Sequence, residues 1–335
     1  MASKPSIGGQ AVMEGVMMRG PESWAVAVRK PDKEIVVQQH ELPTYPSRHK
    51  WTKKPFLRGV WVLVESMMIG FQALKISAAY AVEEEGDTPE DATTVEKTLN
   101  YSLGIGMVVI TALFITVPAF ISKWGGSRLG VEGDLSQNLL EGGIRMSIFL
   151  GYVILIGFIP DIRRVFQYHG AEHKTIYAYE NDDPMEPEII DTYSTLHVRC
   201  GTNFLFVVMI LAIIGHFIAD LLLQGTPVWV KLAARILMIP VVAGTSYEVI
   251  RAAGRNDRSI IFRIVSLPGL AVQKITTRPP TLDQIEVAIK AMEGVISRIP
   301  VAEAETETET VQVYEVQGAA EPGGALSPEP GGELA

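Results

Sequence analysis

The sequence lacks the features of a secreted or nucleic-acid-binding protein. Its 335 residues include a single cysteine, so no disulfide can form within the chain. The first 50 residues contain no apolar run of the kind found in a secretory signal. No basic patch interleaved with aromatic residues is present, so we expect no nucleic-acid partner. These absences predict that the amino-terminal segment lies in a reducing cytoplasm.

Positive charge is missing from the last part of the chain. Residues 301–335 hold eight Glu and no Lys or Arg, and this tail accounts for all but one unit of the formal net charge of −9. The acidic balance therefore implies no basic partner for residues 1–300. Glu-Thr repeats followed by Pro- and Gly-rich sequence cannot bury enough apolar area to fold, so we predict a disordered acidic tail over 301–335.

Long apolar runs, by contrast, are abundant. The chain is 47% hydrophobic with a mean hydropathy of +0.21. The apolar excess is concentrated in runs long enough to cross a bilayer, which takes about 20 residues each. Four runs predict membrane spans and make the lipid bilayer the expected partner: 101–122, 144–160, 203–224 and 228–250.

A fifth apolar segment, 58–82, differs from these four because it carries Glu65, Gln72 and Lys75 along one stripe. Such a stripe favours an interfacial or protein-packed helix over a true span. With four spans, the loops on one side hold 23 Lys and Arg against five on the other. The positive-inside rule then places both termini of this multi-pass membrane protein in the cytoplasm. A fifth span would export the basic amino-terminal region.

The predicted fold class is mainly α: a polytopic helical membrane protein with about four spans, one interfacial helix and a small cytoplasmic β-hairpin near the amino terminus. The hairpin is predicted from 24–29 and 34–38, which flank a turn at 31–33. Helical periodicity after a capping box at Thr281 and Gln284 predicts an amphipathic helix. The resulting division is 1–55 glycine-rich and hairpin segment, 56–99 interfacial helix and acidic loop (83–99), 100–250 membrane domain with a cytoplasmic insertion at 161–202, 251–300 cytoplasmic basic and amphipathic helices, and 301–335 tail.

The one strong chemical motif is His169-Gly-Ala-Glu172-His173, directly after the second predicted span. If this stretch is helical, His169 and His173 lie one turn apart on the same face. Two imidazoles at this spacing can bind one metal ion, with Glu172 beside them. The order H-x-x-E-H is that of the inverzincins, in which the Glu acts as general base. The alternative is a polar helix face that holds two histidines without a metal.

A catalytic zinc needs a third protein ligand. His197 and Cys200, just before the third predicted span, are the nearest candidates. Cys200 is a soft ligand, although a lone cysteine at a membrane boundary is equally well explained as a small buried residue. Glu248 offers a carboxylate or pairs with Arg251 one turn away. Glu14, between glycines, is either a further site residue or a turn residue.

Three segments of the chain together resemble a known family. They are Gly8-Gly-Gln-Ala-Val-Met-Glu-Gly-Val-Met-Met-Arg-Gly-Pro21, His169-Gly-Ala-Glu-His-Lys-Thr175 and Arg199-Cys-Gly-Thr-Asn-Phe204. The resemblance is to the bacterial membrane family called domain of unknown function 1385, over about residues 5–300. That family is usually described as predicted metal-dependent membrane enzymes. The resemblance implies that the motif residues form one site: Glu14, Arg19, His169, Glu172, His173, His197, Arg199 and Cys200.

The leading hypothesis is a metal-dependent hydrolase at the cytoplasmic membrane face. His169 and His173 would bind a divalent metal, with zinc the expected ion and His197 or Cys200 the third ligand. Glu172 would be the base, and Arg19 or Arg199 would hold an anionic group of the substrate. One alternative is a non-catalytic scaffold or assembly factor that binds other membrane proteins. A transporter is less favoured, because the first two spans lack ionisable residues inside the membrane.

The third and fourth predicted spans carry charged residues near the short turn that joins them. Helices joined by a short turn are antiparallel neighbours, so residues equally distant from the turn lie at similar depth. This mirror relation pairs Asp220 with Lys231 and His216 with Arg235. We therefore predict an Asp220–Lys231 salt bridge, with Arg235 extending towards Asp220.

Overall fold

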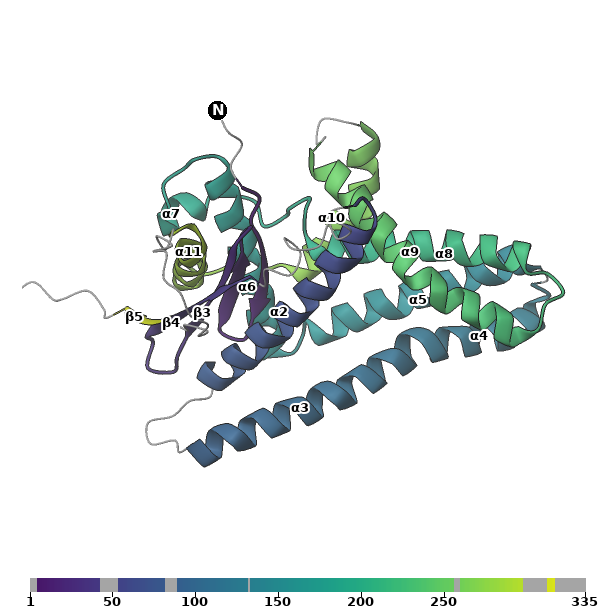
Figure 1. The fold of residues 1–335 in the computed structure, drawn as a ribbon, viewed down its shortest axis with the longest axis horizontal. Coiled ribbons are helices and arrows are strands. Elements are labelled where there is room, and N and C mark those ends of the chain that lie inside the picture. Colours follow the sequence, from purple (N-terminus) through teal and green to yellow (C-terminus); the bar gives the residue numbers. More distant parts are fainter. Residues whose placement is uncertain are drawn as a thin grey trace, which may run out of the picture.

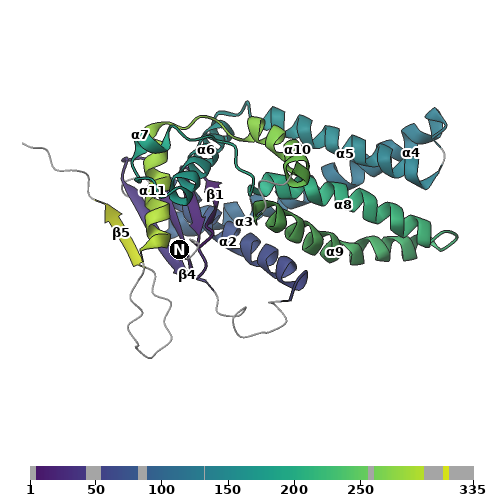
Figure 2. The same ribbon diagram turned by 90° about the horizontal axis from the view of Figure 1, so that it is seen from above.

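A small antiparallel sheet lies at one end of the molecule and long helices extend from it (Figures 1 and 2). The computed structural model describes residues 5–42, 54–81, 89–131, 133–255, 260–297 and 312–316. The strands follow one another in space in chain order. They are β1 (Gly8–Val12), β2 (Gly15–Arg19), β3 (Ser23–Arg29), β4 (Ile35–Glu41) and β5 (Gln312–Val316).

The β3–β4 hairpin confirms the predicted one, with Val28 opposite Val36. The sheet is nevertheless larger than predicted, because the glycine-rich segment forms β1 and β2 rather than turns alone. Glu14 takes a positive φ of 49° in the tight turn between them. Gly15 lies so close to the backbone of Ala27 that a side chain there would clash, which explains why this position of the segment is a glycine.

The predicted acidic tail, 301–335, contains β5, which pairs with β4. The segment Val-Gln-Val-Tyr-Glu-Val at 311–316 alternates apolar and polar residues, the pattern of a strand with one covered face. The Glu-Thr repeats and the Pro/Gly-rich end lie outside the described residues.

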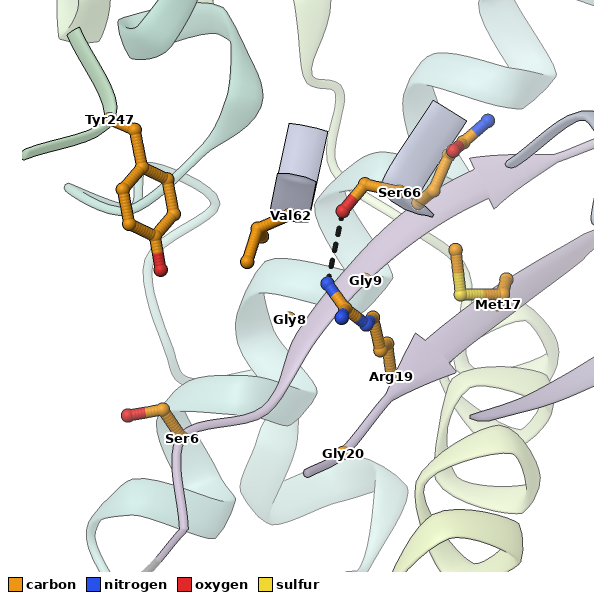
Figure 3. A pocket seen from close by; sticks show the side chains of 10 residues that line it. Ser6, Gly8, Gly9, Met17, Arg19, Gly20, Val62, Ser66 and Tyr247 are labelled. Atoms are coloured by element: carbon orange, nitrogen blue, oxygen red, sulfur yellow. Dashed lines mark hydrogen bonds between the residues drawn. The ribbon is translucent and has the colours of Figure 1, made fainter. Parts of the chain in front are cut away.

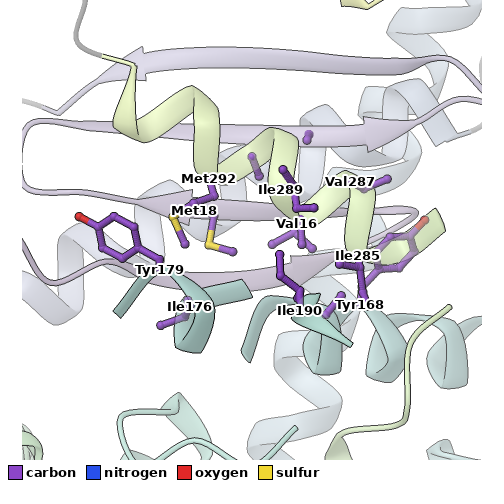
Figure 4. Close-up of a cluster of buried hydrophobic side chains, with 14 of the residues drawn as sticks. Val16, Met18, Tyr168, Ile176, Tyr179, Ile190, Ile285, Val287, Ile289 and Met292 are labelled. Carbon is purple, nitrogen blue, oxygen red and sulfur yellow. The ribbon is translucent and has the colours of Figure 1, made fainter. Parts of the chain in front are cut away.

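One face of the sheet is covered by α6 (Pro160–Glu180), α7 (Pro187–Ile190) and α11 (Leu282–Ile296). Figure 4 shows the core between these layers, with Val16 and Met18 of β2 facing Ile285 and Met292 of α11. The predicted capping box begins α11: Thr281 and Gln284 make both of its reciprocal hydrogen bonds. Segments far apart in the sequence therefore share one hydrophobic core.

The other face of the sheet is covered by α2 (Leu57–Ala81), which is the segment predicted to be interfacial. Its Ile69 and Ala73 are buried in a second core with residues of β1, β2 and β3. The polar stripe is used in this packing, since buried Glu65 forms an ion pair with Arg19 of β2. At its start, α2 contacts the long helix α9 (Val228–Arg255) through an ion pair between Arg58 and Glu248.

The remaining long helices are strongly apolar, as the sequence predicts. They are α3 (Pro89–Thr111), continued by the π-helical turn η2 (Ala112–Thr116) and α4 (Val117–Leu129), then α5 (Asp134–Ile156), α8 (Gly201–Leu222) and α9 (Val228–Arg255). Within the part of the chain that the structure describes, five helical stretches are long and apolar enough to cross a membrane. They are α2, the continuous stretch α3–η2–α4, α5, α8 and α9.

Two predicted boundaries are wrong. Helix α3 already begins at Pro89, inside the predicted acidic loop 83–99, because proline is well accommodated in the first helical turn. Helix α5 begins at Asp134 and ends at Ile156, whereas the span was predicted over 144–160. Pro160 instead starts α6, since its fixed φ suits a new helix and ends the preceding one.

The predicted Asp220–Lys231 salt bridge is also wrong, whereas the predicted extension of Arg235 towards Asp220 is confirmed. Asp220 of α8 pairs with Arg235 of α9 at 3.1 Å and accepts a hydrogen bond of 3.0 Å from Asn138 of α5. The mirror argument considered two helices only. The third helix, α5, supplies a partner that two-helix depth matching cannot reveal.

Candidate metal site

Helix α6, which carries the His169–His173 motif, packs on the face of the sheet that α7 and α11 also cover. The motif is helical, as predicted, so the two imidazoles lie one turn apart and their ring centroids are 4.4 Å from each other. Gly170, between them, lies against the backbone carbonyl of Arg278, where any larger residue would clash. The close approach of chain segments after α10 (Ile260–Thr276) fixes the motif in place.

Two backbone carbonyls orient the imidazoles. Nδ1 of His169 lies 2.9 Å from the carbonyl oxygen of Thr276, and Nδ1 of His173 lies 2.5 Å from that of Thr195. A carbonyl oxygen only accepts, so each Nδ1 carries the proton and donates it. Each Nε2 is then left with a free lone pair, which is the form in which histidine binds a metal.

Cys200 completes a cluster with His169 and His173. Its Sγ lies 3.2 Å from Nε2 of His169, and one ligand atom from each of the three residues lies within 4.8 Å of the other two. Cys200 is buried and stands immediately before α8, as its N-cap residue. Nε2 of His173 is buried without a hydrogen-bond partner. We call His169, His173 and Cys200 the His–His–Cys cluster.

Glu172, the predicted base, is buried between α6 and β1. Its side chain packs against Gly9, where an added Cβ would lie 2.8 Å from the carboxyl group. Burial raises the pKa of Glu172 to about 7, against the opposing effects of His169 and His197 and a hydrogen bond from the backbone amide of Ala11. One carboxyl oxygen, Oε2, has no hydrogen-bond partner.

His197 lies beside the cluster without joining it. Its ring centroid is 5.6 Å from that of His173 and 4.6 Å from that of Tyr177. The side-chain amide of Gln273 holds the backbone of His197 through two hydrogen bonds of 2.8 Å. Burial lowers the pKa of His197 to about 4, so the ring is neutral at pH 7 and its 3.6 Å contact with Glu180 is not an ion pair.

The other predicted site residues are engaged elsewhere. Glu14 forms an ion pair with Arg164 of α6. Glu248, near the end of α9, forms an ion pair with Arg58 of α2. The two candidate anion-binding arginines each contact a carboxylate: Arg19 contacts Glu65, and Arg199 contacts Glu180. Of the nine residues singled out from the sequence, the structure therefore brings three together as potential ligands, with Glu172 and His197 adjacent.

Sequence reasoning missed Thr195, Thr276 and Gln273. The two threonines act through backbone carbonyls, which every residue possesses, so no sequence signal could have identified them. Gln273 is a polar residue within the amphipathic segment after the last span, and it is fully buried. A buried glutamine needs hydrogen-bond partners, and here the partner is the backbone of His197.

A cavity of about 330 Å³ lies on the opposite face of the sheet, between β1, β2 and α2. Figure 3 shows Arg19 in this cavity, with its guanidinium donating to Ser66 of α2 and with Tyr247 of α9 across from it. Gly8 and Gly9 line the cavity, so the β1 backbone separates it from Glu172. Six residues of the glycine-rich motif thus line this cavity, and none belongs to the His–His–Cys cluster.

The fold and site define a class: a mainly helical protein with a small α/β domain that carries a His–His–Cys cluster. Its described part includes five helices long and apolar enough to cross a membrane. The chain belongs to the family described as protein of unknown function (DUF1385), which it matches over residues 54–298. It is 33% identical to the uncharacterized protein YqhQ of Bacillus subtilis (strain 168) over 299 residues, covering 86% of this chain and 91% of the relative. These matches confirm the resemblance seen in the motifs. No solved structure matches the chain.

Proposed function

We propose that this protein is a zinc-dependent hydrolase of the bacterial inner membrane, with its metal centre at the cytoplasmic face. The observation that carries the proposal is a cluster of His169, His173 and Cys200 in which backbone carbonyls orient both imidazoles and leave both Nε2 lone pairs free. Two imidazoles and a thiolate form a donor set that zinc favours. Three protein ligands leave one position open, which is typical of catalytic zinc sites and not of structural ones.

Each residue then has a distinct role. His169, His173 and Cys200 hold the ion, which as a Lewis acid would polarise a substrate carbonyl and lower the pKa of water. Glu172, next to His173 on α6, would take a proton from the attacking water and pass it to the leaving group, so that water is added across the cleaved bond. The partnerless Oε2 of Glu172 is available for this transfer.

The topology that we propose has four spans, α3–α4, α5, α8 and α9, with α2 outside the hydrocarbon. Hydrophobic packing supports this number. The sheet precedes α2 in the chain, whereas α6 and α11 follow it, yet all three share one core. If α2 crossed the membrane as well as the other four, the sheet and α6 would lie on opposite sides. The distribution of Lys and Arg assigns the shared side to the cytoplasm.

One observation favours a non-catalytic scaffold as a second candidate. The 3.2 Å separation of Cys200 Sγ and His169 Nε2 also fits a hydrogen bond from a thiol to an imidazole. In that case the cluster would stabilise the junction of α6 and α8 without a metal. The two candidates differ in metal content.

The decisive experiment is elemental analysis of the full-length protein, produced with zinc supplied and purified in lipid nanodiscs. We expect stoichiometric zinc in the wild-type protein. His173→Ala and Cys200→Ser should each lose most of it, because two remaining ligands bind zinc weakly. Folded wild-type protein without zinc would contradict the metal centre and favour the scaffold.

The chain offers matched histidine controls. His40 of β4 stacks on Trp24 at 4.1 Å between ring centroids, away from the cluster, so His40→Ala should keep its zinc. His197→Asn is a sharper control, because His197 is buried beside His173 but is not part of the cluster. Zinc loss in His197→Asn with retention in Cys200→Ser would show that the wrong third ligand has been assigned.

A further inference from the structure

Among the described side chains of helix α10, large apolar ones face outward, and the buried ones are mostly polar: Ser266, Gln273 and Thr276, with Val272 as the apolar exception. Ile260, Ile264 and Leu267 are 66%, 59% and 58% exposed, whereas Ser266 and Gln273 are 2% and 0% exposed. A surface helix in water shows the opposite arrangement, with its apolar face towards the core. The reversal indicates that the medium outside α10 is apolar.

The two faces are well separated. At 100° per residue, Ile260, Ile264 and Leu267 fall within about 60° of one another and form one stripe. On the buried side, Gly269 packs closely against Asn203 at the start of α8, and Gln273 bonds to the backbone of His197. Gln273 therefore has a protein partner, whereas Ser266 Oγ is buried without one. The apolar stripe is exposed in the part of the chain that the structure describes.

The direction of α10 differs from that of the spans. Helices α5, α8 and α9 run along the length of the molecule in both views, whereas α10 crosses them near their ends next to the sheet (Figures 1 and 2). Its 17 residues extend about 25 Å at 1.5 Å per residue, less than the roughly 30 Å of a bilayer core. The helix is thus placed along a membrane surface and not across it.

The charge of this part of the sequence is strongly positive. Residues 251–278 contain a single acidic residue, Asp257, and six basic ones: Arg251, Arg255, Arg258, Arg263, Lys274 and Arg278. Basic side chains next to an apolar helix stripe are attracted to anionic lipid headgroups. The positive charge and the apolar stripe therefore both favour an anionic lipid bilayer as the partner of α10.

We propose that α10 lies in the plane of the membrane interface, with Ile260, Ile264 and Leu267 among the acyl chains of an anionic bilayer. The inference rests on the membrane insertion of α8 and α9 given above and is independent of the metal. It has a consequence for the site, because Thr276 and Gln273 of α10 hold His169 and His197. The His–His–Cys cluster is then held at the level of the lipid headgroups, where it meets substrates presented by the membrane.

Nitroxide labels on introduced cysteines can test this placement. Ile264→Cys and Leu267→Cys would each be labelled in full-length protein, in nanodiscs of phosphatidylcholine and phosphatidylglycerol. The relative collision rates with oxygen and with a water-soluble nickel complex then report depth. Controls are Leu237→Cys, exposed on α9 within its apolar stretch, and Glu293→Cys, exposed on α11. The native Cys200 is buried, so wild-type protein taken through the same labelling reaction serves as the blank.

We expect both α10 labels to favour oxygen over nickel, at a depth between those of the two controls, about 5–10 Å into the interface. A nickel collision rate equal to that at Glu293 would place the stripe in water and overturn the proposal. Shielding from both reagents with spin–spin broadening would show that a second copy of the chain covers the stripe, and would also overturn it. If the Leu237 label is in water too, membrane insertion itself is wrong.

Discussion

At the scale of single residues, the candidate site depends on close packing at glycine, where a side chain would not fit. Gly269 of α10 packs against Asn203, whose side-chain amide donates to the carbonyl of Val198 at 2.6 Å and whose backbone amide donates to that of Cys200 at 3.1 Å. These bonds define the turn that places Cys200 before α8. A change at Gly269 therefore affects the cysteine of the cluster without touching it.

We predict that Gly269→Ala destabilises the protein, because a Cβ there would overlap the Asn203 side chain and lie 2.8 Å from its Cα. Overpacking of this kind costs about 1–3 kcal/mol. Thermal unfolding in detergent should show a lower Tm, and zinc retention should fall with it. Gly151→Ala on α5, where no atom lies within 4 Å of an added Cβ, should leave the Tm unchanged. Equal Tm values for the two variants would contradict the packing.

The sequence predicts the parts of the site that depend on local spacing, and it does not predict the parts that depend on tertiary contacts. The H-x-x-E-H spacing predicts the imidazole pair, because helix geometry alone brings positions 169 and 173 together. Cys200 stood out as the single cysteine of the chain. The sequence leaves the choice between His197 and Cys200 open, since both lie in one segment. The structure places Cys200 Sγ 3.2 Å from His169 Nε2 and leaves the His197 ring outside the cluster. The partners of Glu14 and Glu248 depend on tertiary contacts with no sequence period.

At the scale of helices and strands, periodicity predicted well where one physical environment dominates. Apolar runs gave the spans, and three-to-four spacing with a capping box gave α11. The glycine-rich strands β1 and β2 were missed because glycine has a low strand propensity and these strands are stabilised by neighbours on both faces. Helix α11 is one of those neighbours, so its contacts should control the stability of the α/β domain.

We predict that Ile285→Ala lowers the free energy of unfolding of this domain by about 2–5 kcal/mol, as a fully buried aliphatic side chain is replaced by a cavity. Ile296→Ala, on the same helix with 42% exposure, should cost much less. Urea unfolding followed by tryptophan fluorescence can measure both, in a background that keeps Trp24, which is buried in the sheet, and replaces the other four tryptophans with Phe. A loss at position 296 as large as that at 285 would mean that α11 is not docked as described.

The membrane helices allow a similar test of their charged contact. Asp220→Asn and Arg235→Gln should be non-additive in a double-mutant cycle, with a coupling free energy of about 0.5–3 kcal/mol. The reason is that each single change leaves the other partner of the pair, 3.1 Å away, uncompensated in an apolar region. Lys231→Gln combined with Asp220→Asn serves as the control cycle and should show weaker coupling. Equal coupling in both cycles would support the Lys231 pairing that the sequence suggested.

At the scale of the whole molecule, the shared core of the sheet, α6 and α11 constrains the membrane topology. These elements are separated in the chain by the four proposed spans and by α2, and they can pack together only if the number of crossings between them is even. The loop between α8 and α9 lies at the far end of the helices in both views (Figures 1 and 2). The α/β domain and this loop should therefore lie on opposite sides of the membrane.

We predict that a membrane-impermeant maleimide modifies Gln224→Cys, in the exposed α8–α9 connection, in intact cells, and leaves Glu188→Cys, exposed on α7, unmodified until the membrane is permeabilised. The physical reason is the excess of Lys and Arg on the side of α7, which retains that side in the cytoplasm. Wild-type protein, whose single cysteine is buried, gives the background. Modification of Glu188→Cys alone in intact cells would invert the topology and move the His–His–Cys cluster to the outer face. Modification of both positions would show that α8, the helix between them, does not cross the membrane. The proposed four-span topology would then be wrong.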